Sequence, residues 1–149
     1  MDVDPRLEEI DDSLYRVAVR ALIVTDNKLL AVKEVDSDDW WAIPGGGVDY
    51  GESLKDCLFR EIKEEIGVPS ASVSSDFQII HYNIGKVVNG VPRMNIFFKV
   101  SVPQDEITKT DHIEKWGWFT EDEFMELGMN PSYDKAELAR VIFKWQNNI

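Results

Sequence analysis

The stretch GGVDYGESLKDCLFREIKEEIGV, which runs from Gly46 to Val68, decides how this chain is organised. It follows Pro44 and continues a run of glycines that begins at Gly45. Proline and consecutive glycines disfavour a helix, so residues 44–47 are predicted to form a loop. A helix that carries clustered carboxylates is predicted to follow this loop.

Both ends of that helix are marked in the sequence. Ser53 precedes Asp56 by three residues, a spacing typical of a helix start, where side-chain oxygens accept hydrogen bonds from free backbone N–H groups. Gly67 and then Pro69 are typical of a helix end, because glycine tolerates the left-handed cap and proline cannot continue the helix. We therefore predict a helix from Ser53 to Ile66.

Three acids lie on or beside the face of this helix that must pack on the protein. At about 100° per residue, Glu61 and Glu65 project from the same side as the apolar residues, and Glu64 lies at its edge. Most charged helix faces are simply solvated, but carboxylates crowded near a packing face repel one another and lose hydration. A bound divalent cation such as Mg²⁺, which takes oxygen ligands, would resolve both problems. The apolar stripe itself consists of Leu54, Cys57, Leu58 and Ile62.

These residues resemble the signature of the Nudix hydrolases (MutT-like). That signature reads glycine, five residues, glutamate, seven residues, then Arg-Glu-aliphatic-any-Glu-Glu-any-Gly-aliphatic. Every defined position is matched, by Gly46, by Glu52 and by Arg60 to Val68. The resemblance implies an α/β fold, with a mixed β-sheet sandwiched between helices as α/β/α layers and the signature as a loop-helix-loop motif. It also implies one Nudix domain over residues 1–149.

The resemblance further implies a chemistry and a set of site residues. Nudix hydrolases cleave a nucleoside diphosphate linked to another moiety, through attack of water on a phosphorus, with Mg²⁺ or Mn²⁺ bound to clustered carboxylates. Carried over by motif position, the metal ligands are Glu61, Glu64 and Glu65, with the carbonyl of Gly45 as a further ligand. The catalytic set is Glu52, Arg60, Glu61 and Glu64: Glu61 is a candidate general base, Arg60 orients the glutamates, and Glu52 helps near the helix start.

Charge and cysteine content narrow the classes of partner. The 149 residues carry a net charge of −12, which disfavours binding to a nucleic-acid backbone or an anionic membrane. The single cysteine, Cys57, rules out an internal disulfide and is expected to lie in the core. Neither a signal peptide at Met1 to Glu9 nor a membrane-spanning stretch is evident. A soluble cytoplasmic protein is therefore expected. The family resemblance implies a small nucleotide-type substrate, and a homodimer is left open.

The remaining elements fit α/β/α layering. Asp26-Asn27 and Asn89-Gly90 are predicted to be tight turns. Alternation and apolar content predict strands at Tyr15–Val24, Leu29–Val35, Asp76–Ile84, Val91–Val102 and Trp116–Phe119. A capping box at Thr120 predicts a short helix that ends near Gly128, and apolar spacing predicts a final helix over Ser132–Trp145.

Residues that would select the substrate are only weakly marked. Trp40 and Trp41 precede the glycine run and face opposite ways on an extended segment. One of them could stack on a nucleobase, with Trp40 taken as the candidate, although a tryptophan there more often packs in a core. Tyr82 and Arg93 lie on the predicted hairpin and are candidates for contact with the substrate. A further acid from the loop before the last strand could complete the site, and the sequence does not choose among Asp105, Glu106, Asp111 and Glu114.

Two other classes of function remain open beside the hydrolase. The preferred hypothesis is a metal-dependent pyrophosphohydrolase acting on a nucleoside triphosphate or a nucleotide-sugar-like compound. The alternative is a non-catalytic Nudix domain that binds a nucleotide as a sensor or interaction module, and the intact acidic cluster argues against it. An acidic interaction protein with purely surface glutamates is disfavoured by the full match to the signature.

Overall fold

Two sheets form the centre of the protein in a computed structural model, which describes residues 14–35, 37, 39–88 and 91–144. The larger sheet has the order β4-β1-β6-β5, with β1 and β6 parallel and the other neighbours antiparallel. Its strands are β1 (Arg16–Leu22), β4 (Gly45–Gly47), β5 (Ile79–Val88) and β6 (Val91–Lys99). The smaller, antiparallel sheet has the order β2-β3-β7 and consists of β2 (Val24–Thr25), β3 (Lys28–Glu34) and β7 (Ile113–Phe119).

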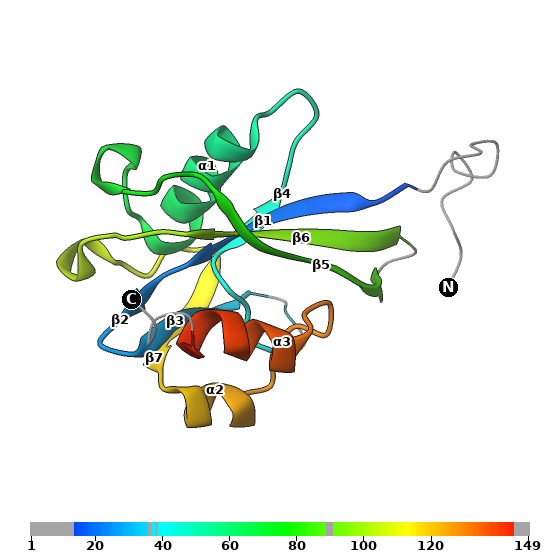
Figure 1. The fold of residues 1–149 in the computed structure, drawn as a ribbon. Coiled ribbons are helices and arrows are strands. Elements are labelled where there is room, and N and C mark those ends of the chain that lie inside the picture. Colours follow the sequence, from blue (N-terminus) through cyan, green and yellow to red (C-terminus); the bar gives the residue numbers. More distant parts are fainter. Residues whose placement is uncertain (1–13, 36, 38, 89–90, 145–149) are drawn as a thin grey trace.

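Helices cover the larger sheet on both sides (Figure 1). Helix α1 (Leu54–Ile66) lies on one side, and α2 (Glu121–Glu126) and α3 (Lys135–Ala139) lie on the other. Helix α3 continues as a π-helical turn at Arg140–Lys144, and short 3₁₀ turns occur at Ser70–Ser72 and Gln104–Glu106. This arrangement confirms the predicted α/β/α layering. None of the described helices is both long and apolar enough to span a bilayer.

The two faces of β1 differ, and that difference positions the site. Val19 and Ala21 are fully buried in the core that includes α1, as the alternation predicts. Arg16 and Arg20 lie on the opposite face, because successive strand residues alternate sides. That second face is shared with Phe97 of β6, which belongs to the core beneath α3.

Helix α1 begins and ends as its sequence predicts. The Ser53 hydroxyl accepts a hydrogen bond of 3.1 Å from the backbone N–H of Asp56. Gly67 adopts φ = 71° and donates its N–H to the Lys63 carbonyl at 3.1 Å, which is the left-handed cap that glycine accommodates most easily. The buried side of α1 comprises Cys57, Leu58, Ile62, Glu65 and Ile66.

One local prediction is wrong. Residues 45–47, predicted as a loop, form the edge strand β4 and pair with Ala18, Val19 and Arg20 of β1. Glycine disfavours a helix, but it does not prevent an extended chain from completing a ladder beside a strand. At Gly45 a Cβ would lie 1.9 Å from the Val19 carbonyl oxygen, so the close pairing itself requires glycine.

The other predicted elements are present with shifted ends. Asp26 and Asn27 form the tight turn with φ values of 52° and 61°, and the capping box of Thr120 and Glu123 is confirmed. The final helix starts later than predicted, at Lys135, because Asp134 caps it by accepting from the Glu137 N–H. The predicted Asn89-Gly90 turn and Trp145, the predicted end of the last helix, lie outside the described residues, as do residues 1–13.

Candidate active site

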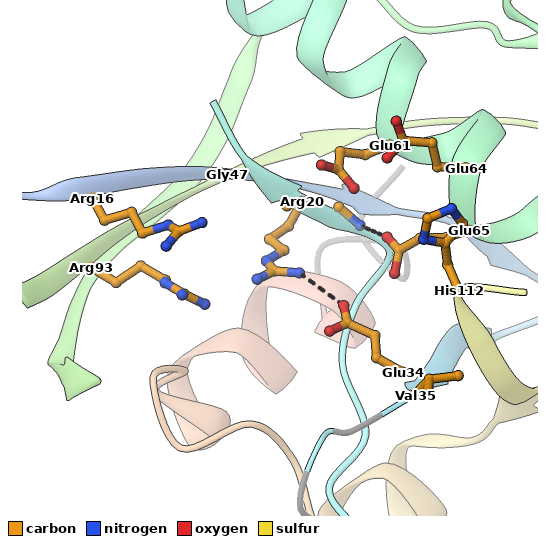
Figure 2. A pocket seen from close by; sticks show the side chains of 12 residues that line it. Arg16, Arg20, Glu34, Val35, Gly47, Glu61, Glu64, Glu65, Arg93 and His112 are labelled. Atoms are coloured by element: carbon orange, nitrogen blue, oxygen red, sulfur yellow. Dashed lines mark hydrogen bonds and ion pairs between the residues drawn. The ribbon is translucent and has the colours of Figure 1, made fainter. Parts of the chain in front are cut away.

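A pocket of about 310 Å³ opens where the edge strand β4 separates the carboxylates of α1 from the arginine face of the large sheet. Figure 2 shows three glutamates of α1 on one side of the pocket and arginines of β1 and β6 on the other. The lining residues are Arg16, Arg20, Glu34, Val35, Gly45, Gly46, Gly47, Glu61, Glu64, Glu65, Arg93 and His112.

Glu65 is the most buried of the three helix carboxylates, with only 4% of its surface exposed. Its carboxylate accepts a hydrogen bond of 2.6 Å from the backbone N–H of Gly45. Burial, followed by the charge of Glu34, raises the pKa of Glu65 well above its usual value, despite that hydrogen bond. The site therefore holds an acid whose ionised form lacks sufficient stabilisation from the protein alone.

Glu61 reaches the pocket over the backbone of β4. Its side chain is 13% exposed, and burial raises its pKa while the nearby Arg60 opposes that rise. A Cβ at Gly46 would lie 2.5 Å from the Glu61 carboxyl carbon, so glycine at this position provides the space for the carboxylate. Glu64 is more open, with 40% of its side chain exposed.

Arg60 connects these acids to the start of the helix. It donates two hydrogen bonds to the Glu52 carboxylate, at 2.8 and 2.9 Å. Its Nη1 donates to Glu61 at 2.8 Å and to Glu64 at 3.4 Å, and its Nη2 donates to the Gly47 carbonyl at 3.1 Å. The paired guanidinium lowers the pKa of Glu52 to about 2. The geometry thus fits an orienting contact for Arg60 and a supporting contact for Glu52, which is not among the pocket-lining residues.

Cys57 sits behind this network rather than in the pocket. It is fully buried, and its Sγ lies 3.5 Å from the Gly47 carbonyl oxygen. Burial raises the pKa of the thiol to about 12. Because the thiolate is the reactive form, Cys57 acts as a packing residue here, in agreement with the sequence.

Arginines form the opposite wall, and sequence analysis assigned only one of them, Arg93, to the site. Arg20 is 3% exposed, donates to the Ile43 carbonyl at 3.1 Å and lies 4.0 Å from the Glu34 carboxylate. Arg16 and Arg93 are direct register partners on β1 and β6. Two arginines four residues apart, on the same side of an otherwise apolar strand, were the available signal for Arg16 and Arg20.

Several other predicted residues lie elsewhere. Trp40 and Tyr82 do not line this pocket, and Tyr82 is 64% exposed beside a different hollow that includes His81 and Glu137. Their contact with substrate stays a prediction. None of the four loop acids lines the pocket either, whereas His112 of the same loop and Glu34 of β3 do. Those two residues become neighbours of α1 only through the fold, and no local pattern marks them.

The chemistry of the pocket fits a hard divalent cation. Glu61, Glu64 and Glu65 offer oxygen ligands, and a cation would stabilise the ionised forms that burial disfavours at Glu61 and Glu65. In the part of the chain that the structure describes, however, no three acidic, histidine or cysteine side chains converge closely enough to hold a metal as they stand. The donor set is therefore suitable, and its side chains need to turn toward a common point.

Comparison with known proteins finds a protein family whose model matches most of this chain. A family model described as the NUDIX domain matches residues 14–141. An RNA pyrophosphohydrolase of Wolbachia pipientis is 30% identical over 130 residues, which cover 77% of this chain and 80% of that protein. The RNA pyrophosphohydrolase of one Campylobacter jejuni strain is 38% identical over 68 residues, which cover 42% of this chain and 44% of that relative. The chain thus spans less than half the length of this second relative.

Solved structures support the same fold. A UDP-X diphosphatase superposes with a TM-score of 0.75 at 19% identity, covering 99% of this chain and 74% of that one. An Ap4A hydrolase of C. elegans gives a TM-score of 0.74 at 16% identity, covering 90% of this chain and 99% of that one. At these identities the likeness establishes the fold and nothing about the substrate.

Proposed function

The chain belongs to the Nudix family, and from this premise we propose that it is a divalent-metal-dependent pyrophosphohydrolase. Its substrate is a nucleoside diphosphate linked to another moiety, such as a nucleoside triphosphate or a nucleotide-sugar-like compound. The observation that carries the proposal is that Glu61, Glu64 and Glu65 enter one pocket from α1, while arginines line its other side. Acids with raised pKa values inside a pocket are typical of catalytic sites.

Nudix hydrolases generally need a divalent metal, and for this chain we propose Mg²⁺ or Mn²⁺. Glu61, Glu64, Glu65 and the Gly45 carbonyl would hold it. The bound ion would supply positive charge to the phosphate oxygens and lower the pKa of a water. The hydrogen bond from the Gly45 N–H already directs the Glu65 carboxylate toward β4.

The protein's own residues would divide the remaining work. The Glu61 carboxylate, raised in pKa by burial, is suited to take a proton from the water that attacks phosphorus. Arg60 would hold Glu61 and Glu64 in place through its Nη1 donors, and Glu52 would fix the plane of Arg60 through its two hydrogen bonds. The guanidinium fork suits this task, since it binds carboxylates with fixed geometry.

The relatives' names suggest one further type of substrate. Two of them are called RNA pyrophosphohydrolases, which makes the 5′ end of an RNA a candidate. The net charge of −12 disfavours binding to a long RNA backbone. Any RNA substrate would therefore be held chiefly through its terminal phosphates in the arginine-lined pocket.

Product release from a substrate panel tests the proposal. The panel contains nucleoside triphosphates, ADP-ribose, nucleotide sugars, dinucleoside polyphosphates and a 5′-triphosphorylated RNA, each with Mg²⁺ and with Mn²⁺. We expect turnover of at least one class, reduced by about a hundredfold or more in Glu61→Gln and Glu65→Gln. Glu121→Gln, an exposed site on α2, is the matched control and should retain full activity. Intact metal binding without any turnover would instead favour a nucleotide-binding module.

A further inference from the structure

The basic wall of the pocket is built by the register of β1 and β6. Arg16 is paired with Arg93 across these parallel strands, so both side chains leave the same face of the sheet. Arg20 lies four residues along β1 on that face, about 13 Å further at ~3.3 Å per residue. Ala18, the residue between the two arginines on this face of β1, is small and almost fully buried.

Positioning of Arg16 depends on the glycine strand. A Cβ at Gly47 would lie 3.1 Å from Arg16 Nη2 and 3.2 Å from its Nε. The guanidinium therefore lies against the bare backbone of β4, at the end of the pocket away from the carboxylates of α1 (Figure 2). Arg93 points into the same space from β6.

Within the described part of the chain, the arginines of this wall lack some of their possible hydrogen-bond and ion-pair partners. The Nε atoms of Arg20 and Arg93 are buried without a hydrogen-bond partner. Among the described residues, no carboxylate forms an ion pair with Arg16 or Arg93, although acids outnumber basic residues by 28 to 16 in the sequence. Burial and the neighbouring arginines also lower the pKa of Arg93. Buried donors without partners and crowded like charges are costly, and a multiply charged anion would relieve both.

The α1 carboxylates and the arginine wall would bind different phosphates of one chain. On the proposed function, on which this inference rests, the diphosphate that is cleaved lies beside Glu61, Glu64 and Glu65. We propose that Arg16 and Arg93 form a separate subsite for a further phosphate of the substrate, with Arg20 as the charged floor between the two regions. The subsite selects substrates with a chain of three or more phosphates over compounds whose diphosphate ends in a neutral sugar.

Arginine suits such a subsite better than lysine would. Its planar guanidinium donates two parallel hydrogen bonds to phosphate oxygens, and two of these groups side by side match the several oxygens of a terminal phosphate. A neutral sugar at the same place would leave both guanidinium groups buried against it without an anion, which is unfavourable. Discrimination between triphosphates and nucleotide sugars thus comes from this wall. The α1 carboxylates bind the diphosphate that both kinds of substrate contain.

Binding of inorganic tripolyphosphate tests the subsite without any hydrolysis. Calorimetry in EDTA at low ionic strength would compare tripolyphosphate with pyrophosphate on the wild type, Arg16→Gln, Arg93→Gln and the double variant. We expect tighter binding of tripolyphosphate by the wild type, and a loss of about tenfold for each arginine removed. Arg140→Gln removes an exposed arginine outside the pocket, which pairs with Glu137, and should bind as the wild type does.

Two outcomes would overturn the subsite: equal affinity of the wild type for the two anions, or unchanged affinity in the double variant. If Arg93→Gln does not fold, the variants Arg16→Gln and Arg16→Lys at the exposed Arg16 test the subsite on their own. The lysine variant keeps the charge but loses the fork, so an intermediate affinity is expected.

The ratio of kcat/KM for ATP over ADP-ribose, and for UTP over UDP-glucose, separates this inference from the proposed function. The double variant should lower each ratio about tenfold or more. Hydrolysis of nucleotide sugars with unchanged ratios would retain the hydrolase and overturn the subsite. Tripolyphosphate binding that depends on both arginines, in a protein that hydrolyses no substrate, would retain the subsite and overturn the hydrolase.

Discussion

The carboxylate of Glu65 accepts a hydrogen bond of 2.6 Å from the backbone N–H of Gly45, and this contact fastens α1 to the edge strand β4. Glu65 is also nearly buried, with Glu34 as a second acid close by. The protein therefore holds a carboxylate whose charge it stabilises poorly. Such an arrangement is costly for the protein alone and is useful when a cation binds.

Glu65→Gln should stabilise the metal-free protein. Because the pKa of Glu65 is raised in the folded state, the unfolded chain releases this proton first as pH rises, and ionisation then favours unfolding. We expect no difference from the wild type well below the ordinary pKa of 4.5, and a gain that grows to about 1–3 kcal/mol at pH 8. Urea denaturation in EDTA across this range measures the gain.

Glu121→Gln provides the control, since Glu121 is an exposed residue of α2. It should change the free energy of unfolding by about 0.5 kcal/mol or less, the size expected for an exposed acid in the first turn of a helix. A Glu65→Gln protein that is less stable than the wild type at pH 8 would show that the charged form of Glu65 contributes to the fold without metal.

Addition of Mg²⁺ should make the wild type more stable than Glu65→Gln, the reverse of the order expected without metal. A ligand that binds only the folded state stabilises it by mass action, by about 2.7 kcal/mol when its concentration is 100 times Kd. We expect the wild type to gain in melting temperature with Mg²⁺ or Mn²⁺, and Glu65→Gln and Glu61→Gln to gain little. A similar gain in all three proteins would place the metal away from these carboxylates.

Arg60→Lys should destabilise the start of α1. It should also leave the Glu52, Glu61 and Glu64 side chains without their common donor. A lysine ammonium cannot span both oxygens of Glu52 and reach Glu61 as the guanidinium does. We expect the melting temperature at pH 7 to fall by about 3–6 °C and kcat to fall more than KM rises. For Arg140→Lys, in an exposed pair with Glu137, we expect almost no change.

The pH dependence of Arg60→Lys identifies its partner. The pKa of Glu52 is lowered from 4.5 to about 2, so the stability that this carboxylate contributes is present above pH 4.5 and is lost as pH falls through 2. The difference between the wild type and Arg60→Lys should therefore narrow over this window in acid denaturation. A constant difference would mean that Glu52 is not the group stabilised by Arg60.

How much the sequence predicts depends on how far apart in the chain the interacting residues lie. Helix α1, its caps at Ser53 and Gly67, and the common face of Glu61 and Glu65 follow from periodicity and local hydrogen bonding. The family resemblance, confirmed over residues 14–141, rests on the same local stretch. These features depend on neighbours within a few helical turns, which is why a single sequence suffices for them.

The arginine wall depends on strand register instead. Arg16 meets Arg93 only because β1 and β6 pair in parallel with one particular alignment. Glu34 comes close to Glu65 of α1 from β3 in the smaller sheet. A slip of one residue would turn each side chain to the opposite face. The loop acids illustrate the same limit: four acids were candidates, but the fold brings His112 to the pocket.

Gly46→Ala should separate the geometry of the site from the stability of the fold. A Cβ at Gly46 would lie 2.5 Å from the Glu61 carboxyl group, and the end of a flexible side chain can move away. We therefore expect a melting temperature within about 3 °C of the wild type and a fall in kcat of about tenfold or more, because Glu61 is displaced. Gly128→Ala, where a Cβ meets nothing within 4 Å, should change neither quantity. Full activity in Gly46→Ala would show that catalysis does not need the space that Gly46 leaves for Glu61.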